Sequence, residues 1–339
     1  MGGCLRILIK RCLTGIIYTD DNTFHSYSYN SRRPLSGFIN LGADYSIDDR
    51  NKITLSQSIF SANMHGDNTI TNEVGHNYTV PISSQVRRNE YAGKPLNGTT
   101  NLQYKHTGKK PKEELNIELN YSTARYIRES SFTTNNYDSL GLLTNRFIQN
   151  NPISGTNSNA TFQIDYTKPL GKKNAKLDVG ERTYLTQFKS ENQPTIQFAN
   201  EPVMDENILK NHFNFNQQVH GLYATYSNKW NNTGVQVGLR GEYFGYEGSI
   251  YQYNAQVKNS YTNLFPTLFL TQKVNKQADL NLNYSRRVNR PNFYQLIPFI
   301  DVSNPLDTSM GNPNLKPEFI HAVEFGYTNQ YSKSNTFMA

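Results

Sequence analysis

The chain has 339 residues, enough for one or two domains, with a net charge of +7 and a mean hydropathy of −0.68. No apolar run approaches the roughly 18 residues of a membrane-spanning helix, which excludes a helical membrane protein. A β-barrel is not excluded, because its strands need apolar residues only at every second position. The 23 tyrosines and 18 phenylalanines, against one tryptophan, favour strands over helices.

The basic residues form no dense block, and several lie in short turns such as 108–111 and 171–174. We therefore expect solvated surface charge rather than a polyanion partner, and no nucleic acid. The two cysteines, Cys4 and Cys12, fit neither a CxxC pair nor a zinc site.

Residues 1–34 carry no interpretable pattern and are left unassigned. Arg6, Lys10 and Arg11 interrupt their apolar stretch, so it lacks the apolar core of a secretory signal. If the protein belongs to a cell envelope, we expect its true start to lie upstream.

From residue 35 onward, apolar and polar residues alternate in segments that read as strands. Short polar turns join these strands in pairs, and long polar stretches, which we expect to be loops, separate the pairs. The stretch 260–273 is apolar on both sides and cannot be oriented. The alternating segments are 39–47, 53–56, 115–122, 162–167, 177–179, 222–226, 235–242, 278–287 and 319–328, and the expected loops are 62–97, 127–158, 190–211, 247–259 and 291–317.

This pattern predicts about eleven strands of roughly 10–16 residues, longer than the usual 5–6 of globular sheets. Outer-membrane barrels place short turns at one end and long loops at the other, whereas soluble sandwiches mix their loop lengths. The predicted fold is therefore all-β: an antiparallel, up-and-down transmembrane β-barrel over residues 35–339, which supplies about 11–12 strands of a larger barrel.

Alternation also assigns faces to individual residues. Val237 should face lipid, and Gln236 should face the lumen. Strict alternation would place Glu181 toward lipid as well. Either a bulge at Gly180 turns Glu181 inward or Glu181 lies beyond the hydrocarbon, and the sequence leaves both open.

The stretch 278–331 contains the segments SRRVNRP, NFYQLIPF and GNPNLKPE. These segments resemble the barrel signature of TonB-dependent outer-membrane receptors, most closely the outer-membrane β-barrel family abundant in Bacteroidetes. The resemblance extends over about residues 35–339, since NLFPTLFLTQKV and GFINLGADYSIDDRNKITLS fit the same pattern. The residues that carry the motif are Arg286, Arg290, Pro291, Pro298, Phe299, Asn304, Pro305, Gly311, Asn312, Pro313, Leu315, Lys316, Pro317 and Glu318.

We expect these motif residues to shape the rim of the barrel rather than to bind a ligand. Pro291 removes a ladder donor and ends a strand. Residues 311–313 read as a turn, and 316–318 lead into the next strand. The apolar and aromatic residues over 293–299 can pack the connector against itself or against the barrel mouth.

The resemblance implies a location in the cell outer membrane, in contact with its lipid, and a barrel of about 22 strands with a plugged lumen. It also implies uptake of a small nutrient ligand of unknown class, with energy from the TonB system. The plug and the TonB-contacting segment are not recognisable here, so we expect the sequence to be a fragment. The alternatives are an adhesin or structural barrel without TonB coupling, and a soluble β-protein that binds glycans.

No catalytic or cofactor motif is recognisable, because HExxH, GxxxxGKS and GxSxG are all absent from the sequence. His212 and His220 lie on one predicted strand, where they share a face but are too far apart for one coordination sphere. We therefore expect no enzyme, no cofactor and no metal site.

Overall fold

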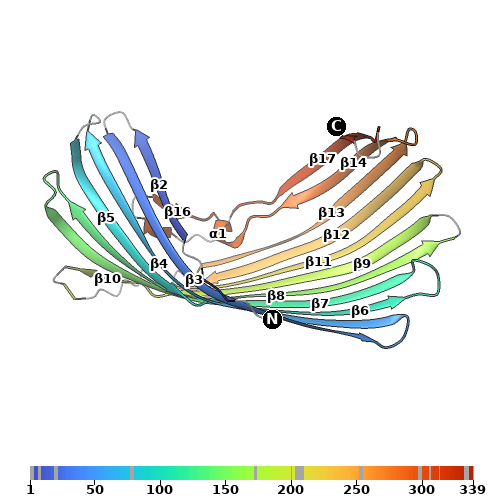
Figure 1. Ribbon diagram of the computed structural model, residues 1–339, viewed down its shortest axis with the longest axis horizontal. Helices are drawn as coiled ribbons and strands as arrows, with labels where there is room; N and C mark the ends of the chain where they lie inside the picture. The colour runs from blue at the N-terminus through green and yellow to red at the C-terminus, as the bar shows by residue number, and fades with distance from the viewer. Residues whose placement is uncertain are drawn as a thin grey trace.

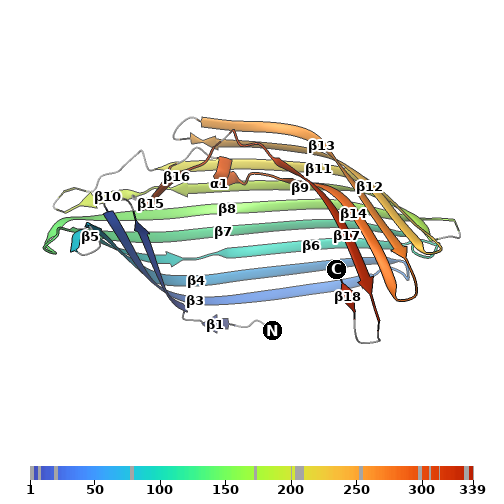
Figure 2. The same cartoon turned by 90° about the horizontal axis from the view of Figure 1, so that it is seen from above.

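The computed structural model describes residues 4–6, 9–18, 22–76, 80–171, 174–199, 201–202, 210–251, 255–296, 300–304, 307–312, 314–331 and 336–338. Most of these residues lie in one antiparallel sheet of 16 strands. Figure 1 shows that this sheet is strongly curved, and Figure 2 shows its central strands running side by side from β3 to β13.

The strands of the sheet are β1 (Cys4–Arg6), β2 (Ile9–Tyr18), β3 (Asn22–Ser46), β4 (Asn51–His76), β5 (Val80–Gly93), β6 (Leu96–Thr107), β7 (Glu114–Tyr137), β8 (Leu143–Leu170), β9 (Ala175–Asn192), β10 (Thr195–Phe198), β11 (Asn211–Trp230), β12 (Thr233–Ile250), β13 (Ala255–Lys273), β14 (Ala278–Asn289), β17 (Glu318–Asn329) and β18 (Phe337–Met338). The connector between β14 and β17 contains a short helix, α1 (Phe293–Leu296), and a separate two-stranded sheet of β15 (Ile300–Asn304) and β16 (Asp307–Met310). Figure 1 shows α1 within the concavity of the curved sheet.

The sheet order is β1-β3-β4-β5-β7-β8-β9-β11-β12-β13-β14-β17-β18, an up-and-down meander in which successive strands pair antiparallel. Short strands join this path at its sides: β2 pairs with β3, and β10 pairs with β8. The predicted antiparallel all-β architecture is therefore confirmed. The strand count exceeds the predicted 11–12 because the sheet includes these short strands and because one long strand is divided into β5 and β6.

The division between β5 and β6 falls at Pro95. β5 pairs with the half of β4 that begins at Met64, and β6 pairs with the half that ends at Ser61. Proline has no N–H to donate to a ladder, so the regular pairing stops there. Its carbonyl still accepts a hydrogen bond from the backbone N–H of Ala62 at 3.1 Å, which keeps the two halves in line.

The two faces of the sheet are set by unbroken alternation along β12. This strand pairs with β11 and β13 without a register shift. Phe244 and Tyr246 pack against Leu296 of α1, so even-numbered residues of β12, including Gln236, lie on the concave face. Val237 lies on the convex face and is 48% exposed. This agrees with the predicted faces.

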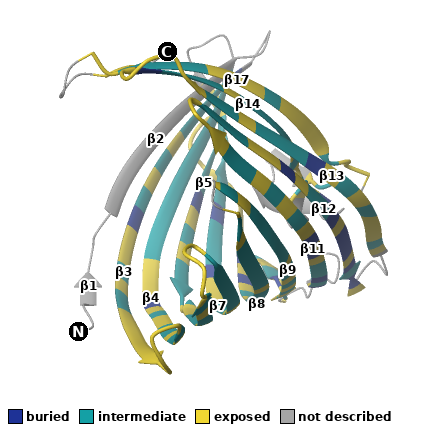
Figure 3. Ribbon diagram, turned by 90° about the vertical axis from the view of Figure 1, so that its right-hand side faces the viewer, coloured by how far each residue is buried: buried dark blue, intermediate teal, exposed yellow. Residues whose placement is uncertain are grey.

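Large apolar side chains are exposed along the convex face. Figure 3 shows exposed and partly buried residues alternating along the strands, with few buried ones. Soluble monomers rarely expose contiguous apolar surface on this scale, so the convex face requires an apolar surrounding. The most exposed of these side chains include Leu41 (65%), Tyr45 (67%), Leu222 (68%), Val323 (70%) and Phe325 (70%).

Three of the five predicted long loops are wrong, because the strands extend through most of them. β4 and β5 occupy most of 62–97, β7 and β8 most of 127–158, and β12 and β13 most of 247–259. Outward residues in these extensions are polar, such as Arg88 and Glu90, which form an exposed ion pair at 3.1 Å. Where both faces of a strand meet water, the apolar alternation disappears although the backbone ladder continues.

The structure also decides the position of Glu181. β9 pairs with β8 and β11 without a register shift, so Gly180 marks no bulge and Glu181 stays on the convex face. Gly180 instead makes room for a ring, since a Cβ there would lie 2.6 Å from the ring of Tyr223. The carboxylate of Glu181 accepts a hydrogen bond from Thr183 at 2.5 Å.

The strand that the sequence could not orient, β13, has its two apolar rows on opposite faces. Leu264 is 54% exposed on the convex face, and Phe265 is 8% exposed opposite Arg240 on the concave face. In the part of the chain that the structure describes, no helix has the length and apolar character needed to cross a membrane.

Candidate functional site: the connector docked on the concave wall

The connector leaves the sheet at the end of β14. Asn289 is the last paired residue, and Pro291 cannot donate to the ladder. Arg290, between them, turns onto the concave wall. Its guanidinium forms an ion pair with Glu242, donates to the hydroxyl of Tyr261 at 3.2 Å and lies 4.7 Å from the ring centre of Phe244.

Glu242 is a buried carboxylate, with only 8% of its side chain exposed. It forms a second ion pair with Arg240, whose guanidinium lies 2.8 Å from Oε2. A buried charge is costly unless it is paired and hydrogen-bonded, and here two guanidiniums offset that cost. Glu242 therefore fixes Arg290, and with it the start of the connector, to the wall.

Helix α1 adds an apolar contact. Leu296 is 2% exposed and packs against Phe215, Val219, Phe244 and Tyr246 of β11 and β12. Burial of a leucine side chain of this kind stabilises the contact by about 1.5–3 kcal/mol. The connector is therefore held on the concave wall by an ion pair at its start, at Arg290, and by an apolar side chain six residues later, at Leu296.

A polar network continues along the same wall away from the connector. The guanidinium of Arg240 lies 5.7 Å from the ring centre of Tyr223, whose hydroxyl donates to Asp165 on β8. Gln163 donates to the other carboxylate oxygen of Asp165 at 2.7 Å. The concave wall is thus lined by paired charges and amides, whereas the convex wall is apolar.

A family model for the outer membrane protein beta-barrel family matches residues 106–339. The chain belongs to this outer-membrane β-barrel family. Its convex face is accordingly the lipid-facing wall, its concave face is the lumen side, and the protein is located in the outer membrane. A comparison with curated proteins found no match.

A comparison with solved structures found similar chains, one of them with a TM-score above 0.5. The siderophore receptor PiuA from Acinetobacter baumannii has a TM-score of 0.51 at 9% identity, over 98% of this chain and 56% of that chain. The ferric citrate transporter FecA has a TM-score of 0.46 at 11% identity, over 96% and 49%. The alcaligin receptor FauA from Bordetella pertussis has a TM-score of 0.45 at 14% identity, over 95% and 50%. The chain spans about half the length of these structures.

The structure places the two motif arginines on opposite faces of the barrel wall. Arg286 is still within β14 and lies on the lipid-facing wall. It donates to the carbonyl oxygen of Leu264 at 2.9 Å and lies 4.5 Å from the ring centre of Phe319. Arg286 therefore ties β14 to its two neighbours, β13 and β17, whereas Arg290 holds the connector inside.

The later motif residues close the connector and start the next strand. The N–H of Asn312 donates to the carbonyl of Gln295 at 2.7 Å, which joins the end of the connector to α1. The Asn312 side chain accepts from the N–H of Asn314 at 2.9 Å, a local turn. Glu318 is the first residue of β17 and accepts from the side chain of Asn289 at 3.2 Å.

The remaining motif residues are less informative. Gly311, Leu315, Lys316 and Pro317 lie in the irregular segment before β17, and Asn304 ends β15. Pro298, Phe299, Pro305 and Pro313 lie outside the described residues.

The residues of the concave face that hold the connector could not be predicted from the sequence. Alternation places Glu242 on the lumen side, but its partner Arg290 is distant in sequence, and no spacing rule joins the two. His212 and His220 are not brought together: the ring of His212 is 4.6 Å from that of Tyr251, and Nδ1 of His220 is 2.7 Å from the hydroxyl of Thr183. Among the residues with described positions, no group of three or more His, Cys, Asp or Glu is arranged to hold a metal ion.

Proposed function

We propose that this barrel takes up a small nutrient ligand across the outer membrane, with energy supplied through the TonB system. The observation that carries the proposal is the contrast between the two walls. The lumen wall is lined by hydrogen-bonded charges such as Asp165, Arg240 and Glu242, and the outer wall by exposed apolar residues. A wall of this kind suits a barrel whose interior holds water, a plug or a polar ligand.

The docked connector supports the same proposal. It folds inward rather than outward, and Arg290 and α1 lie against the concave face, where they would narrow the lumen of the complete barrel. A narrowed lumen suits selective passage of a ligand better than it suits a purely structural barrel. In this proposal residues 35–339 form the barrel domain, and the motif residues of the connector shape its rim.

TonB coupling is supported by the motif resemblance and by the shared fold with a siderophore receptor. The test is uptake in cells: deletion of the gene, and separately of the TonB gene, should abolish growth on one nutrient supplied at limiting concentration. A panel of labelled iron chelates, cobalamins, glycans and peptides identifies that nutrient. Each deletion strain is complemented with its own gene as the control.

Two outcomes would contradict the proposal. Uptake that persists without TonB, or after collapse of the proton gradient, would show a passive barrel. A gene deletion that leaves growth on every nutrient unchanged but reduces attachment of cells to surfaces would favour the adhesin alternative.

A further inference from the structure

The lipid-facing wall changes character along each strand. On β12, Val237, Leu239 and Tyr243 are exposed on this wall, and the next charged residue on the same face is Glu247. On β13 the exposed Leu264 is followed, further from the short turn, by Lys258. The apolar band therefore has an upper edge, and polar residues begin immediately beyond it.

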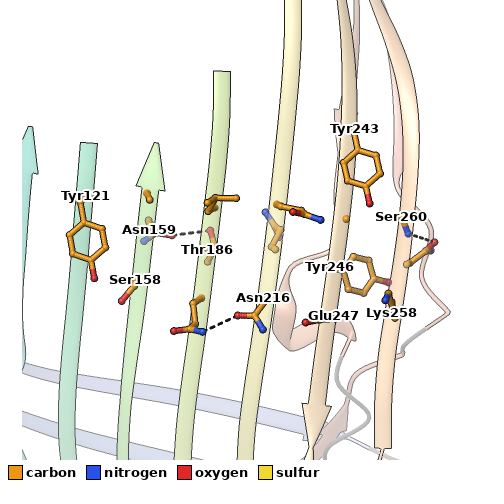
Figure 4. A pocket seen from close by; sticks show the side chains of 17 residues that line it. Tyr121, Ser158, Asn159, Thr186, Asn216, Tyr243, Tyr246, Glu247, Lys258 and Ser260 are labelled. Atoms are coloured by element: carbon orange, nitrogen blue, oxygen red, sulfur yellow. Dashed lines mark hydrogen bonds between the residues drawn. The ribbon is translucent and has the colours of Figure 1, made fainter. Parts of the chain in front are cut away.

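A depression of about 610 Å³ lies at this edge, lined by residues of β7, β8, β9, β11, β12 and β13, most of which face the outer wall. We call it the outer-rim depression. Its floor is a row of directly paired residues from four neighbouring strands: Gln187, Asn216, Glu247 and Lys258. Figure 4 shows Asn216, Glu247 and Lys258 from this row, with Tyr243 further along the same strand as Glu247.

The position of the depression relative to the membrane follows from strand geometry. Outer-membrane barrels have their short turns on the periplasmic side, so the short turn before Thr233 lies on the periplasmic side of the membrane. At about 3.3 Å per residue and a tilt of about 40°, the stretch from Thr233 to Glu247 rises roughly 35 Å, whereas the apolar band is roughly 25 Å tall. The depression therefore faces the headgroup layer of the outer leaflet.

The chemistry of the lining suits hydroxyl groups rather than a cluster of phosphates. Gln187 is exposed and donates to the half-buried Asn216 at 3.1 Å, and each side-chain amide has two N–H donors and an acceptor oxygen, more than this one bond uses. One anion, Glu247, and one cation, Lys258, balance each other, so the lining offers no net positive charge. Of the three tyrosines in the lining, Tyr121 (49% exposed) and Tyr243 (38% exposed) offer apolar rings beside the amides.

We propose that the outer-rim depression binds the saccharide headgroup of a glycolipid in the outer leaflet. Amides and a balanced charge pair recognise sugar hydroxyls, and tyrosine rings cover the apolar faces of the sugar. The acyl chains of the same molecule would continue onto the apolar band below, which is already the lipid contact of the barrel. The volume lies within the range of pockets that hold small ligands, roughly 300–1,000 Å³.

The test uses the protein purified from its outer membrane and reconstituted in vesicles of phosphatidylethanolamine and phosphatidylglycerol, with or without rough lipopolysaccharide. The glycolipid retained per protein after detergent extraction is measured by mass spectrometry. The double variant Gln187→Leu/Asn216→Leu removes the amides and keeps side-chain bulk. Gln57→Leu is the matched control, because Gln57 is also an outer-wall amide that accepts a hydrogen bond, from Thr100, but lies on β4 away from the depression.

We expect the double variant to retain at least tenfold less glycolipid than the wild type, and the control to retain the wild-type amount. Equal retention by all three proteins would overturn the proposal. Tight binding of the free core oligosaccharide, without its acyl chains, would also overturn it by identifying a soluble sugar as the ligand. If the double variant does not fold, as judged by heat-modifiable gel mobility, Asn216→Ser alone should still lower retention several-fold.

Discussion

The docking of the connector can be tested through a single buried side chain. Leu296 is 2% exposed in an apolar cluster with Phe215, Val219, Phe244 and Tyr246. Truncation of a buried leucine to alanine costs roughly 2–5 kcal/mol, because the transfer energy is lost and a cavity remains. Here the cost falls on the docked state of the connector, since the barrel strands keep their ladder hydrogen bonds.

A loss of about 2 kcal/mol would raise the undocked population roughly 30-fold, since about 1.4 kcal/mol corresponds to a factor of ten. Hydrogen exchange of peptides that cover 291–312, measured by mass spectrometry on the folded barrel, should accelerate by that factor or more in Leu296→Ala. The amide of Asn312, which donates to Gln295 of α1, should be among the affected sites.

Leu315→Ala is the matched control, because Leu315 belongs to the same connector but is 38% exposed. Its truncation should change exchange by no more than about twofold. Equal acceleration in the two variants, or none in either, would refute the reasoning that Leu296 holds α1 on the wall.

Three further predictions concern the barrel wall and one of its turns. Val237→Arg should destabilise the folded barrel by roughly 2–4 kcal/mol if the site lies near mid-bilayer, and Gln236→Arg should cost little, as measured by urea titration in vesicles; equal costs would count against the assigned faces. Gly180→Ala should destabilise the barrel by about 1–3 kcal/mol in the same titration, because its Cβ would lie 2.6 Å from a neighbouring tyrosine ring and from a backbone oxygen, and Gly42→Ala, whose nearest contact is 3.6 Å, should not. A hydrogen bond from the backbone N–H two residues further along the chain lowers the pKa of Asp48 from its ordinary 3.8. The protection of this turn against amide exchange should therefore be present at neutral pH and lost as the pH falls through the lowered pKa. Asp48→Asn should remove this pH dependence, and persistence of the pH dependence in the variant would contradict the assignment.

The sequence predicts the strands best where they contact lipid. The hairpin of β14 and β17 lies within one or two residues of the alternating segments 278–287 and 319–328. Alternation also places Val237 and Gln236 on opposite faces of the barrel wall. It works there because lipid on one side and a polar lumen on the other impose different residues at successive positions.

The same signal fails beyond the membrane. β7 and β8 are 24 and 28 residues long, but their outer halves carry polar residues on both faces, so no periodic pattern marks them as strands. The ladder continues because backbone hydrogen bonds do not depend on side-chain polarity. Hydrophobic periodicity therefore measures the thickness of the lipid contact rather than the length of the strand.

The docking site of the connector could be predicted only in part. The proline after Arg290 and the turn residues near Asn312 are readable as local signals. The ion pair between Arg290 and Glu242 is not, because it depends on which strand of the wall lies beneath the connector. That register is set by pairing across β12, β13 and β14, which local sequence does not encode.

Each strand of the barrel has a lipid-facing and a lumen-facing row of side chains. The most direct measurement places single cysteines in both rows of the folded protein and compares their reaction with a maleimide that partitions into lipid and with one that dissolves only in water. We expect the lipid-soluble reagent to label Val237, Leu282 and Phe325, and to leave Gln236, Asn281 and Glu324 unlabelled. Labelling of the second set in preference to the first would contradict this assignment.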